Sequence, residues 1–217
     1  MIGVHQPPRQ RGGLFITVEG IEGVGKSTQV KLIADYLRSR DQSVVETREP
    51  GGTVVGELIR EVVLNKVPAK MAPTTELLLM FAARAEHLDK VICPALAAGH
   101  CVVSDRFTDA SYAYQGAGRG IVQSRIALLE DYVQGSLRPD LTLLLDAPVD
   151  IALARASHRG VVNRFEEDED RRFFEAVRKG YLELARIYRD RFRVVDATQP
   201  IGQLMDQIRG YLTPLLP

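Results

Sequence analysis

The sequence lacks a surplus of charge of either sign, because its 217 residues hold 28 Lys and Arg against 28 Asp and Glu. This balance excludes the general positive field that drives sequence-independent binding to nucleic acid. Any anion that the chain binds is therefore held by a local arrangement of residues, and we expect no nucleic-acid partner.

Long apolar runs are also missing. Runs such as Leu141–Leu145 fall far short of the roughly 18 residues that span a bilayer, so we expect no membrane association. Residues 1–13 hold no apolar stretch of the kind found in a secretory signal, and we interpret them as a flexible N-terminal leader. Residues 14–217 are predicted to form one domain, since a domain typically holds about 100–200 residues.

Cysteine is scarce, since only Cys93 and Cys101 are present and they form no C-x-x-C pair. This spacing indicates neither a zinc site nor a disulfide framework. We therefore expect a reduced, cytoplasmic setting. Hydrophobic residues make up 45% and charged residues 26%, which is typical of a globular protein and excludes intrinsic disorder.

Five short apolar segments, rich in β-branched residues, resemble parallel strands that are covered on both faces. They are Leu14–Val18, Ser43–Thr47, Cys101–Ser104, Leu141–Leu145 and Arg193–Val195. Helical patterns lie between them. Thr28–Arg40 carries Val30, Ile33, Ala34 and Leu37 on one stripe, and Glu76–Ala98 carries Leu77, Met80, Phe81, Ala85 and Leu88.

This alternation predicts a three-layer α/β fold, with a five-stranded parallel sheet flanked by helices. Two segments interrupt it: a glycine-rich loop at Gln115–Gly120 and a charged stretch at Ser157–Asp170. Ligands in such folds bind at the carboxyl ends of the strands, so irregular segments there are candidate lids.

The clearest motif is a phosphate loop between the first strand and the first helix. It reads Gly20, Ile21, Glu22, Gly23, Val24, Gly25, Lys26, Ser27 and then Thr28, matching G-x4-G-K-S/T. Its glycines let backbone amides turn toward phosphate oxygens, and the helix start adds partial positive charge. Lys26 would contact the β- and γ-phosphates of ATP, and the Ser27 hydroxyl would bind Mg²⁺.

Two apolar strands end in an acid that could complete the metal site. Asp105 is followed by Arg106 and a polar neighbourhood that can hold both a metal and an anion. Asp146 is followed by Ala147-Pro148, which is typical of a strand end or a helix cap. We favour Asp105 as the second Mg²⁺ ligand, with Asp146 as the alternative.

A GTPase is disfavoured because the chain has no N-K-x-D sequence to read guanine: Asn65-Lys66 runs into Val67-Pro68. Helicases and motor ATPases are disfavoured as well, because the chain has no room for their extra subdomains.

Further motifs occur in a recognisable order from about Leu14 to the end. They are Glu19-Gly20 with the phosphate loop, 47–53 (T-R-E-P-G-G-T), 81–84 (F-A-A-R), 105–107 (D-R-F), 113–116 (A-Y-Q-G) with 118–120 (G-R-G), 138–141 (R-P-D-L) and 196–198 (D-A-T). As a set they resemble bacterial thymidylate kinases. The resemblance implies a P-loop nucleoside monophosphate kinase fold with a short lid, usually a homodimer, which uses ATP and Mg²⁺ to convert dTMP to dTDP in dTTP biosynthesis.

A monophosphate acceptor brings roughly two negative charges toward a second phosphate, so cationic side chains must neutralise the crowding. Arg48, Arg84 and Arg106 come from three strand ends or helices and could converge on the acceptor phosphate with their bidentate forks. By resemblance, Glu22 faces the 3′-hydroxyl of dTMP. Pro50 would form a rigid wall of the site.

The base needs a stacking surface and hydrogen-bond partners. Ser111 and Gln115 are reasonable partners for the pyrimidine edge, and Tyr114 could close against the sugar so that a 2′-hydroxyl does not fit. Many family members have Phe four residues before the equivalent arginine, where this chain has Met80, with Phe81 one step later. Both positions are within reach of the same helix face, so the choice between them stays open.

A kinase must also keep water from its acceptor, which requires a segment that closes over the nucleotides. Residues 157–170 are the candidate lid, and either Arg159 or Arg164 would stabilise charge between the β- and γ-phosphoryl groups, an effect worth roughly 10³ to 10⁵ in rate. On resemblance alone, the adenine end of ATP would contact Arg155, Thr198 and Gln199.

Two rival functions remain at this stage. Another P-loop kinase could act on a nucleoside or a different monophosphate, because the thymine methyl provides only about 1–3 kcal/mol of discrimination. A nucleotide-binding regulator without turnover is the second, although the predicted second anion site argues against it.

Overall fold

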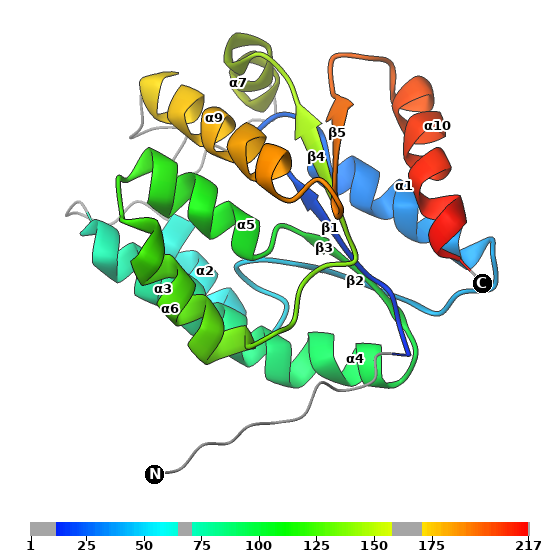
Figure 1. The fold of residues 1–217 in the computed structure, drawn as a ribbon, viewed down its shortest axis with the longest axis horizontal. Helices are drawn as coiled ribbons and strands as arrows, with labels where there is room; N and C mark the ends of the chain where they lie inside the picture. Colours follow the sequence, from blue (N-terminus) through cyan, green and yellow to red (C-terminus); the bar gives the residue numbers. More distant parts are fainter. Residues whose placement is uncertain (1–11, 65–70, 158–170, 217) are drawn as a thin grey trace.

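The computed structural model describes residues 12–64, 71–157 and 171–216. Five parallel strands form a sheet in the order β2-β3-β1-β4-β5 (Figure 1). The strands are β1 (Phe15–Glu19), β2 (Val44–Arg48), β3 (Cys101–Asp105), β4 (Leu141–Asp146) and β5 (Phe192–Asp196). Each boundary lies within one residue of the predicted segment, so the predicted five-stranded parallel sheet is confirmed.

Burial follows each strand's place in the sheet. The three central strands, β1, β3 and β4, consist almost wholly of buried residues, because helices cover them on both faces. The edge strands β2 and β5 leave several residues half-buried or exposed. The apolar runs of the sequence therefore mark the centre of the sheet, where the phosphate loop begins.

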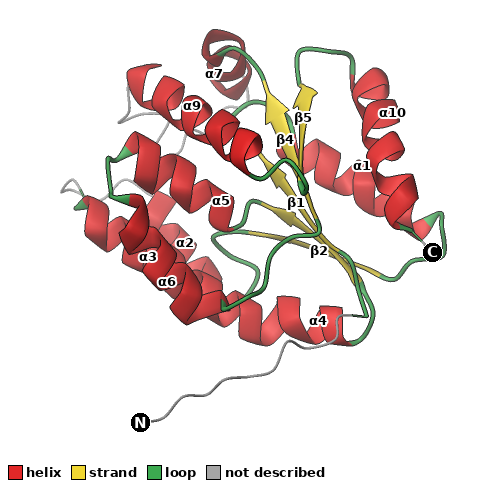
Figure 2. Cartoon of the chain, viewed as in Figure 1, coloured by secondary structure: helices red, strands yellow, loops and turns green. Residues whose placement is uncertain are grey.

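Helices connect successive strands. They are α1 (Lys26–Arg38), α2 (Val54–Leu64), α3 (Pro73–His87), α4 (Cys93–Ala97), α5 (Thr108–Ser111), α6 (Gln123–Gln134), α7 (Val149–Ser157), α9 (Arg171–Ile187) and α10 (Ile201–Leu212). Helices α1 and α10 cover one face of the sheet, whereas α4 and α9 contact the other (Figure 2). Helices α2 and α6 both pack against α3 on the outside of the molecule, at the lower left of Figure 2.

The predicted stripe of the first helix is confirmed, since Val30, Ile33, Ala34 and Leu37 are all buried in α1. The single helix predicted over Glu76–Ala98 is not. A π-helical turn, η1 (Leu88–Ile92), separates α3 from α4.

The break in that helix precedes Pro94, which has no amide to donate and therefore disturbs the helical ladder. The amide of Cys93 bonds to the carbonyl of Leu88, five residues back. Ala85 is exposed rather than part of the buried stripe, and Arg84 takes a buried place beside it.

The glycine-rich loop predicted at Gln115–Gly120 is also wrong for most of its length, because a π-helix, η2 (Tyr112–Gly118), runs through it. A Cβ at Gly118 would lie 2.5 Å from the ring of Phe173 on α9. The glycine is thus needed for close packing of two helices, and this segment is not a lid.

The part of the predicted leader at residues 1–11 lies outside the described residues, while the amide of Gly13 bonds to Leu96 O at 3.1 Å. Within residues 12–64, 71–157 and 171–216, we find no helix with the length and apolar character that crossing a membrane requires.

Candidate active site

The phosphate loop lies between the carboxyl end of β1 and the start of α1, as predicted. Two of its glycines are sterically required: a Cβ at Gly20 would lie 2.4 Å from Leu145 O, and one at Gly23 would lie 1.8 Å from Ala152 O. Both have positive φ, which glycine adopts without strain. The sequence thus forces a tight turn whose amides can face a phosphate.

Lys26 begins α1, and its Nζ bonds to Ile21 O at 2.8 Å, inside the loop. Burial and, to a smaller extent, the Arg106 guanidinium lower the pKa of Lys26 to about 8, although Asp105, Glu22 and Glu19 oppose the shift. A bound phosphate would supply the negative charge that favours the protonated amine.

The two predicted metal ligands are brought together, because Ser27 Oγ donates to Asp105 Oδ2 at 2.9 Å. Mg²⁺ in nucleotide sites takes one or two protein oxygens and completes its shell with phosphates and water, so this pair fits such an ion. The described residues contain no cluster of three His, Cys, Asp or Glu that could hold a metal alone. Asp146 is engaged elsewhere, in a bidentate ion pair with Arg178 at 2.7 and 2.8 Å.

Arg106 is held across the top of the loop in a left-handed backbone conformation, φ 73°. Its Nη1 donates to Gly20 O at 2.9 Å and to the hydroxyl of Tyr181 at 3.0 Å. Its Nη2 donates to Glu22 Oε1 at 3.0 Å and to the hydroxyl of Tyr114 at 2.9 Å. The guanidinium therefore sits directly beside the phosphate loop.

Tyr114 completes this arrangement by donating its hydroxyl to Glu22 Oε2 at 2.6 Å. Its ring lies under the guanidinium of Arg106, at 4.7 Å from the ring centroid. Burial raises the pKa of Tyr114 well above its ordinary value, although Arg106 opposes the shift, so the phenol stays a neutral donor. Glu22 and Tyr114, both predicted to meet the sugar, are thus adjacent.

Arg84 lies on α3 and is 1% exposed. Its Nε donates to Glu49 Oε2 at 2.8 Å, and its Nη2 donates to Ser111 Oγ at 3.1 Å and Phe107 O at 3.3 Å. Nη1 is buried and has no hydrogen-bond partner among the residues that the structure describes. Such an orphan donor is rare in a native protein and indicates a group that a ligand can satisfy.

Gln115 has the complementary feature. Its Nε2 donates to Glu76 Oε1 at 2.9 Å, whereas its Oε1 is buried and finds no partner within residues 12–64, 71–157 and 171–216. Arg119 holds the same carboxylate, from Nη2 to Glu76 Oε2 at 3.1 Å. The buried Glu76 therefore fixes the orientation of the amide.

Met80 and Phe81 are both buried, with 8% and 2% of their surface exposed. Met80 belongs to the same large apolar cluster as Tyr114. The ring of Phe81 lies under the Arg84 guanidinium, 4.5 Å from ring centroid to Cζ, and packs in a separate cluster with Ile126. Both predicted alternatives thus border the Arg84 region.

Arg48 ends β2 beside Asp105, but its guanidinium is half exposed and bonds to Glu57 Oε2 at 2.8 Å. Pro50, predicted as a wall, accepts a bond from Arg60 Nη1 to its carbonyl at 2.8 Å. Burial lowers the pKa of Arg60, as does the neighbouring Arg48, while Glu57 and Asp105 oppose the shift. Arg60 is therefore a further cation near the predicted acceptor site.

The predicted adenine end lies at the other side of the phosphate loop. Arg155 Nη1 donates to Ala197 O at 2.7 Å, and the amide and hydroxyl of Thr198 bond to Asp196 Oδ1. Thr198 and Gln199 line an open cavity of about 500 Å³ beside the Asp146–Arg178 pair. The lid arginines Arg159 and Arg164 lie outside the described residues.

Three residues of the site did not emerge from sequence reasoning: Arg60, Glu76 and Tyr181. A signal existed for Arg60, because it lies on the helical stripe of the buried Gly56 and Val63, where a charge is unusual. No comparable signal marks Glu76 or Tyr181, whose partners lie far away in the sequence.

Comparison with known proteins agrees with this geometry. Residues 18–208 match the profile of the family described as thymidylate kinase. The chain is 55% identical over 204 residues to a thymidylate kinase of Pseudomonas savastanoi pv. phaseolicola, covering 94% of this chain and 97% of that protein. It is 58% identical over 201 residues to one of Alkalilimnicola ehrlichii, with 92% of each covered. The crystal structure of a thymidylate kinase from Ehrlichia chaffeensis superposes with a TM-score of 0.75 at 34% identity, over 93% of this chain and 99% of that one.

Proposed function

The chain belongs to the thymidylate kinase family, and from that premise we propose which of its residues carry the reaction. As a dTMP kinase it transfers the γ-phosphoryl group of ATP to dTMP, giving dTDP and ADP, a step of nucleotide biosynthesis. One observation supports the assignment of residues above all: Arg106 is bonded to the phosphate loop itself, so a donor and an acceptor phosphate would meet there.

The donor side is formed by the loop amides with Lys26, Ser27 and Asp105. Residues 20–28 would bind the phosphates of ATP, and Lys26 would balance charge on the β- and γ-phosphates. Ser27 and Asp105 would hold Mg²⁺, which when bound neutralises phosphate charge and orients the donor. Phosphoryl transfer through a loose transition state needs mainly such positioning and charge, and little proton transfer.

The acceptor side is formed by Arg106, with Arg48 at the end of the neighbouring strand, around the phosphate of dTMP. Glu22 would receive the 3′-hydroxyl, and Tyr114 would close against C2′ of the sugar. In this arrangement dTMP takes over contacts that Glu22, Tyr114 and Arg106 now make with one another.

The base would lie against Pro50 and Met80 or Phe81, near Ser111. The buried Nη1 of Arg84 and Oε1 of Gln115 lack partners among the described residues. A donor and an acceptor of this kind suit the carbonyl and N–H groups of a pyrimidine edge, so the base would satisfy both.

The remaining roles rest on the resemblance. Residues 14–217 would act as one domain, in which Arg155, Thr198 and Gln199 contact adenine. In the lid, residues 157–170, Arg159 or Arg164 would contact the transferred phosphoryl group. Residues 1–13 would be a leader without a part in the reaction.

We further propose that two copies pair through α2, α3 and α6. These packed helices carry large apolar side chains that are exposed in the single chain, at Val54, Val55, Leu58, Val62, Leu78, Leu128 and Tyr132. A patch of this kind marks a protein interface. The two thiols, Cys93 and Cys101, are free, which is consistent with a reducing cytoplasmic setting.

A coupled assay of ADP release tests the assignment across dTMP, dUMP, UMP, CMP and thymidine. We expect dTMP to be preferred, and Arg106→Ala to lower the rate of transfer steeply, to a residual value that the assay still measures, while the affinity for an unreactive ATP analogue survives. Arg186→Ala is the matched control, because Arg186 is exposed and pairs with Glu183 three residues away on the same helix. Preference for thymidine, or equal loss of transfer and ATP affinity in Arg106→Ala, would overturn the assignment.

A further inference from the structure

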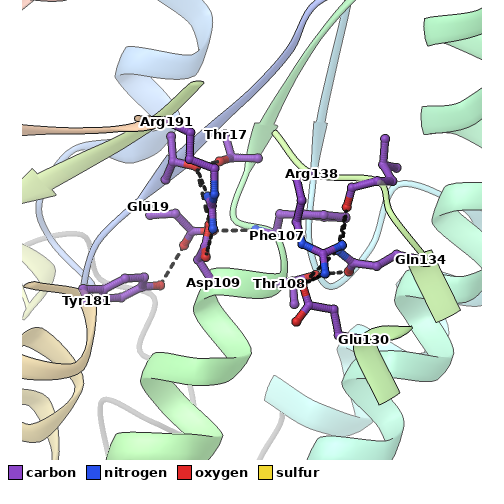
Figure 3. A network of polar contacts seen from close by, with 12 residues as sticks. Thr17, Glu19, Phe107, Thr108, Asp109, Glu130, Gln134, Arg138, Tyr181 and Arg191 are labelled. Atoms are coloured by element: carbon purple, nitrogen blue, oxygen red, sulfur yellow. Dashed lines mark hydrogen bonds and ion pairs between the residues drawn. The ribbon is translucent and has the colours of Figure 1, made fainter. Parts of the chain in front are cut away.

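Glu19 is a buried carboxyl group that has no part in the roles assigned so far. It is the last residue of β1, directly before the phosphate loop, and it is 0% exposed. Its Oε1 accepts the amide of Phe107 at 2.7 Å, and its Oε2 accepts the hydroxyl of Tyr181 at 2.7 Å (Figure 3). Burying a carboxyl group costs free energy unless hydrogen-bond partners replace the water that it loses.

Both partners of Glu19 adjoin Arg106. Phe107 is the next residue in the chain, so the amide held by Glu19 belongs to the peptide bond that leaves Arg106. Tyr181, on α9, uses its hydroxyl to accept Arg106 Nη1 at 3.0 Å. One carboxyl group thus supports the backbone and, through Tyr181, the guanidinium of the same arginine.

The backbone of Arg106 needs such support, because a non-glycine residue with φ 73° lies in a sparsely populated region. Its own amide bonds to Val18 O at 3.0 Å, and its carbonyl accepts Ser104 Oγ at 2.7 Å. The Glu19–Phe107 bond completes the set that holds this turn.

The other partners of the guanidinium are groups that the substrates also use. Gly20 and Glu22 belong to the phosphate loop, and Tyr114 is assigned to the sugar. Tyr181 differs, since it is 1% exposed and bonded to Glu19 rather than to a substrate group. The Glu19–Tyr181 pair is therefore the part of the arrangement that none of the proposed substrate contacts replaces.

We propose that Glu19 and Tyr181 are positioning residues for phosphoryl transfer, which act by fixing Arg106 in its left-handed turn with its guanidinium over the acceptor phosphate. This inference rests on the proposed role of Arg106. Neither residue is assigned a substrate contact, so their effect should pass entirely through that arginine.

The test combines Tyr181→Phe and Glu19→Met with Arg106→Ala. Tyr181→Phe removes only a hydroxyl, whereas Glu19→Met keeps the length of the side chain and removes both acceptors. A hydrogen bond to a charged group corresponds to roughly a 10- to 100-fold effect, so we expect kcat/KM for dTMP to fall about tenfold in Tyr181→Phe and further in Glu19→Met. The affinity for an unreactive ATP analogue should change less than about twofold.

In the Arg106→Ala background we expect both substitutions to lose their effect on kcat/KM for dTMP. Asp140→Asn is the matched control: its carboxylate also accepts a strand-β1 amide, Phe15 N, at 2.7 Å, but at the opposite end of the strand. It should lower the melting temperature and leave kcat/KM for dTMP unchanged in either background.

The inference is overturned if Tyr181→Phe and Glu19→Met lower kcat/KM by the same factor with and without Arg106, or leave it unchanged. If Glu19→Met does not fold, Tyr181→Phe alone decides by the same comparison. A different outcome marks failure of the proposed function itself: Arg106→Ala would then leave kcat/KM for dTMP at the wild-type value.

Discussion

The hydroxyl of Ser27 donates to a carboxylate oxygen of Asp105 across 2.9 Å, and so joins the first turn of α1 to the carboxyl end of β3. Helix α1 follows β1 through the phosphate loop, and β1 is the neighbour of β3 in the sheet, with Val18 paired to Asp105. The pair therefore has a fixed geometry beside the phosphate loop, as a metal site requires.

We predict that Asp105→Asn raises the Mg²⁺ concentration needed for half-maximal activity by at least about tenfold, since even residues that support metal ligands contribute roughly 10- to 100-fold to affinity. Titration of Mg²⁺ at saturating ATP and dTMP measures this shift. Asp146→Asn is the control, because Asp146 pairs with Arg178 and should leave the midpoint in place. A larger shift in Asp146→Asn would assign the metal to the alternative acid.

Glu19 also predicts how stability depends on pH. Burial and, to a smaller extent, Asp109 raise its pKa from 4.5 to about 8, although Arg106, Tyr181 and Phe107 oppose the shift. Between these two pKa values the folded state holds a proton that the unfolded state has released. The free energy of unfolding should therefore fall as pH rises from about 5 to about 8, by up to about 1.4 kcal/mol per pH unit.

Urea unfolding of the wild type and Glu19→Gln at pH 5, 6.5 and 8 isolates the contribution of Glu19 to the pH dependence of stability, because the two proteins have all other titratable groups in common. We expect the stability of Glu19→Gln relative to the wild type to increase steadily over this range. A difference that stays constant, or that changes in the opposite direction, would show that the Glu19 pKa is close to its ordinary value in the folded protein.

The sheet and the phosphate loop could be predicted because their signals are local. Apolar β-branched runs identify the strands. The phosphate-binding motif is complete within the eight consecutive residues Gly20–Ser27. Asp105 is favoured over Asp146 as the partner of Ser27 because a polar neighbourhood follows it in the sequence, and the structure brings the Ser27 and Asp105 side chains into contact.

Long-range packing explains what the sequence did not reveal. Tyr181 meets Glu19 across 162 residues, and nothing in an amphipathic helix distinguishes a tyrosine that buries its ring from one that also supports an arginine. The glycine-rich composition near Gln115 predicts a loop, whereas Gly118 in fact allows η2 and α9 to approach closely. Composition alone does not separate glycine for flexibility from glycine for contact.

The apolar face of α2, α3 and α6 predicts the oligomeric state. Leu58→Glu places a charge in the middle of the exposed apolar side chains of α2. Burying this carboxylate in the dimer interface would cost more free energy than the apolar contact provides. Sedimentation should show a dimer for the wild type and a monomer for this variant.

The matched control for that variant is Ile201→Glu, since Ile201 is 58% exposed against 59% for Leu58 but lies at the start of α10, away from α2. It should remain a dimer. A monomeric wild type, or dissociation of both variants, would contradict pairing through these helices.

Packing of η2 against α9 gives a final prediction, because η2 carries Tyr114 and Gln115. A Cβ at Gly118 would lie 2.5 Å from the Phe173 ring and 2.9 Å from Val177 Cγ2. Gly118→Ala should therefore destabilise the protein by about 1–3 kcal/mol, as overpacking does. It should also raise KM for dTMP more than KM for ATP, since the helix that moves carries Tyr114 and Gln115, to which we assign the sugar and base contacts.

Gly210→Ala is the natural comparison, because Gly210 lies in helix α10 and a Cβ there would meet nothing within 4 Å. This change should stabilise the protein by about 0.5–1 kcal/mol through helix propensity and leave both KM values unchanged. Thermal unfolding and steady-state kinetics of the two variants separate the effects. If Gly118→Ala were as stable as Gly210→Ala, the two helices would have room to spare, and the glycines of η2 would need another explanation.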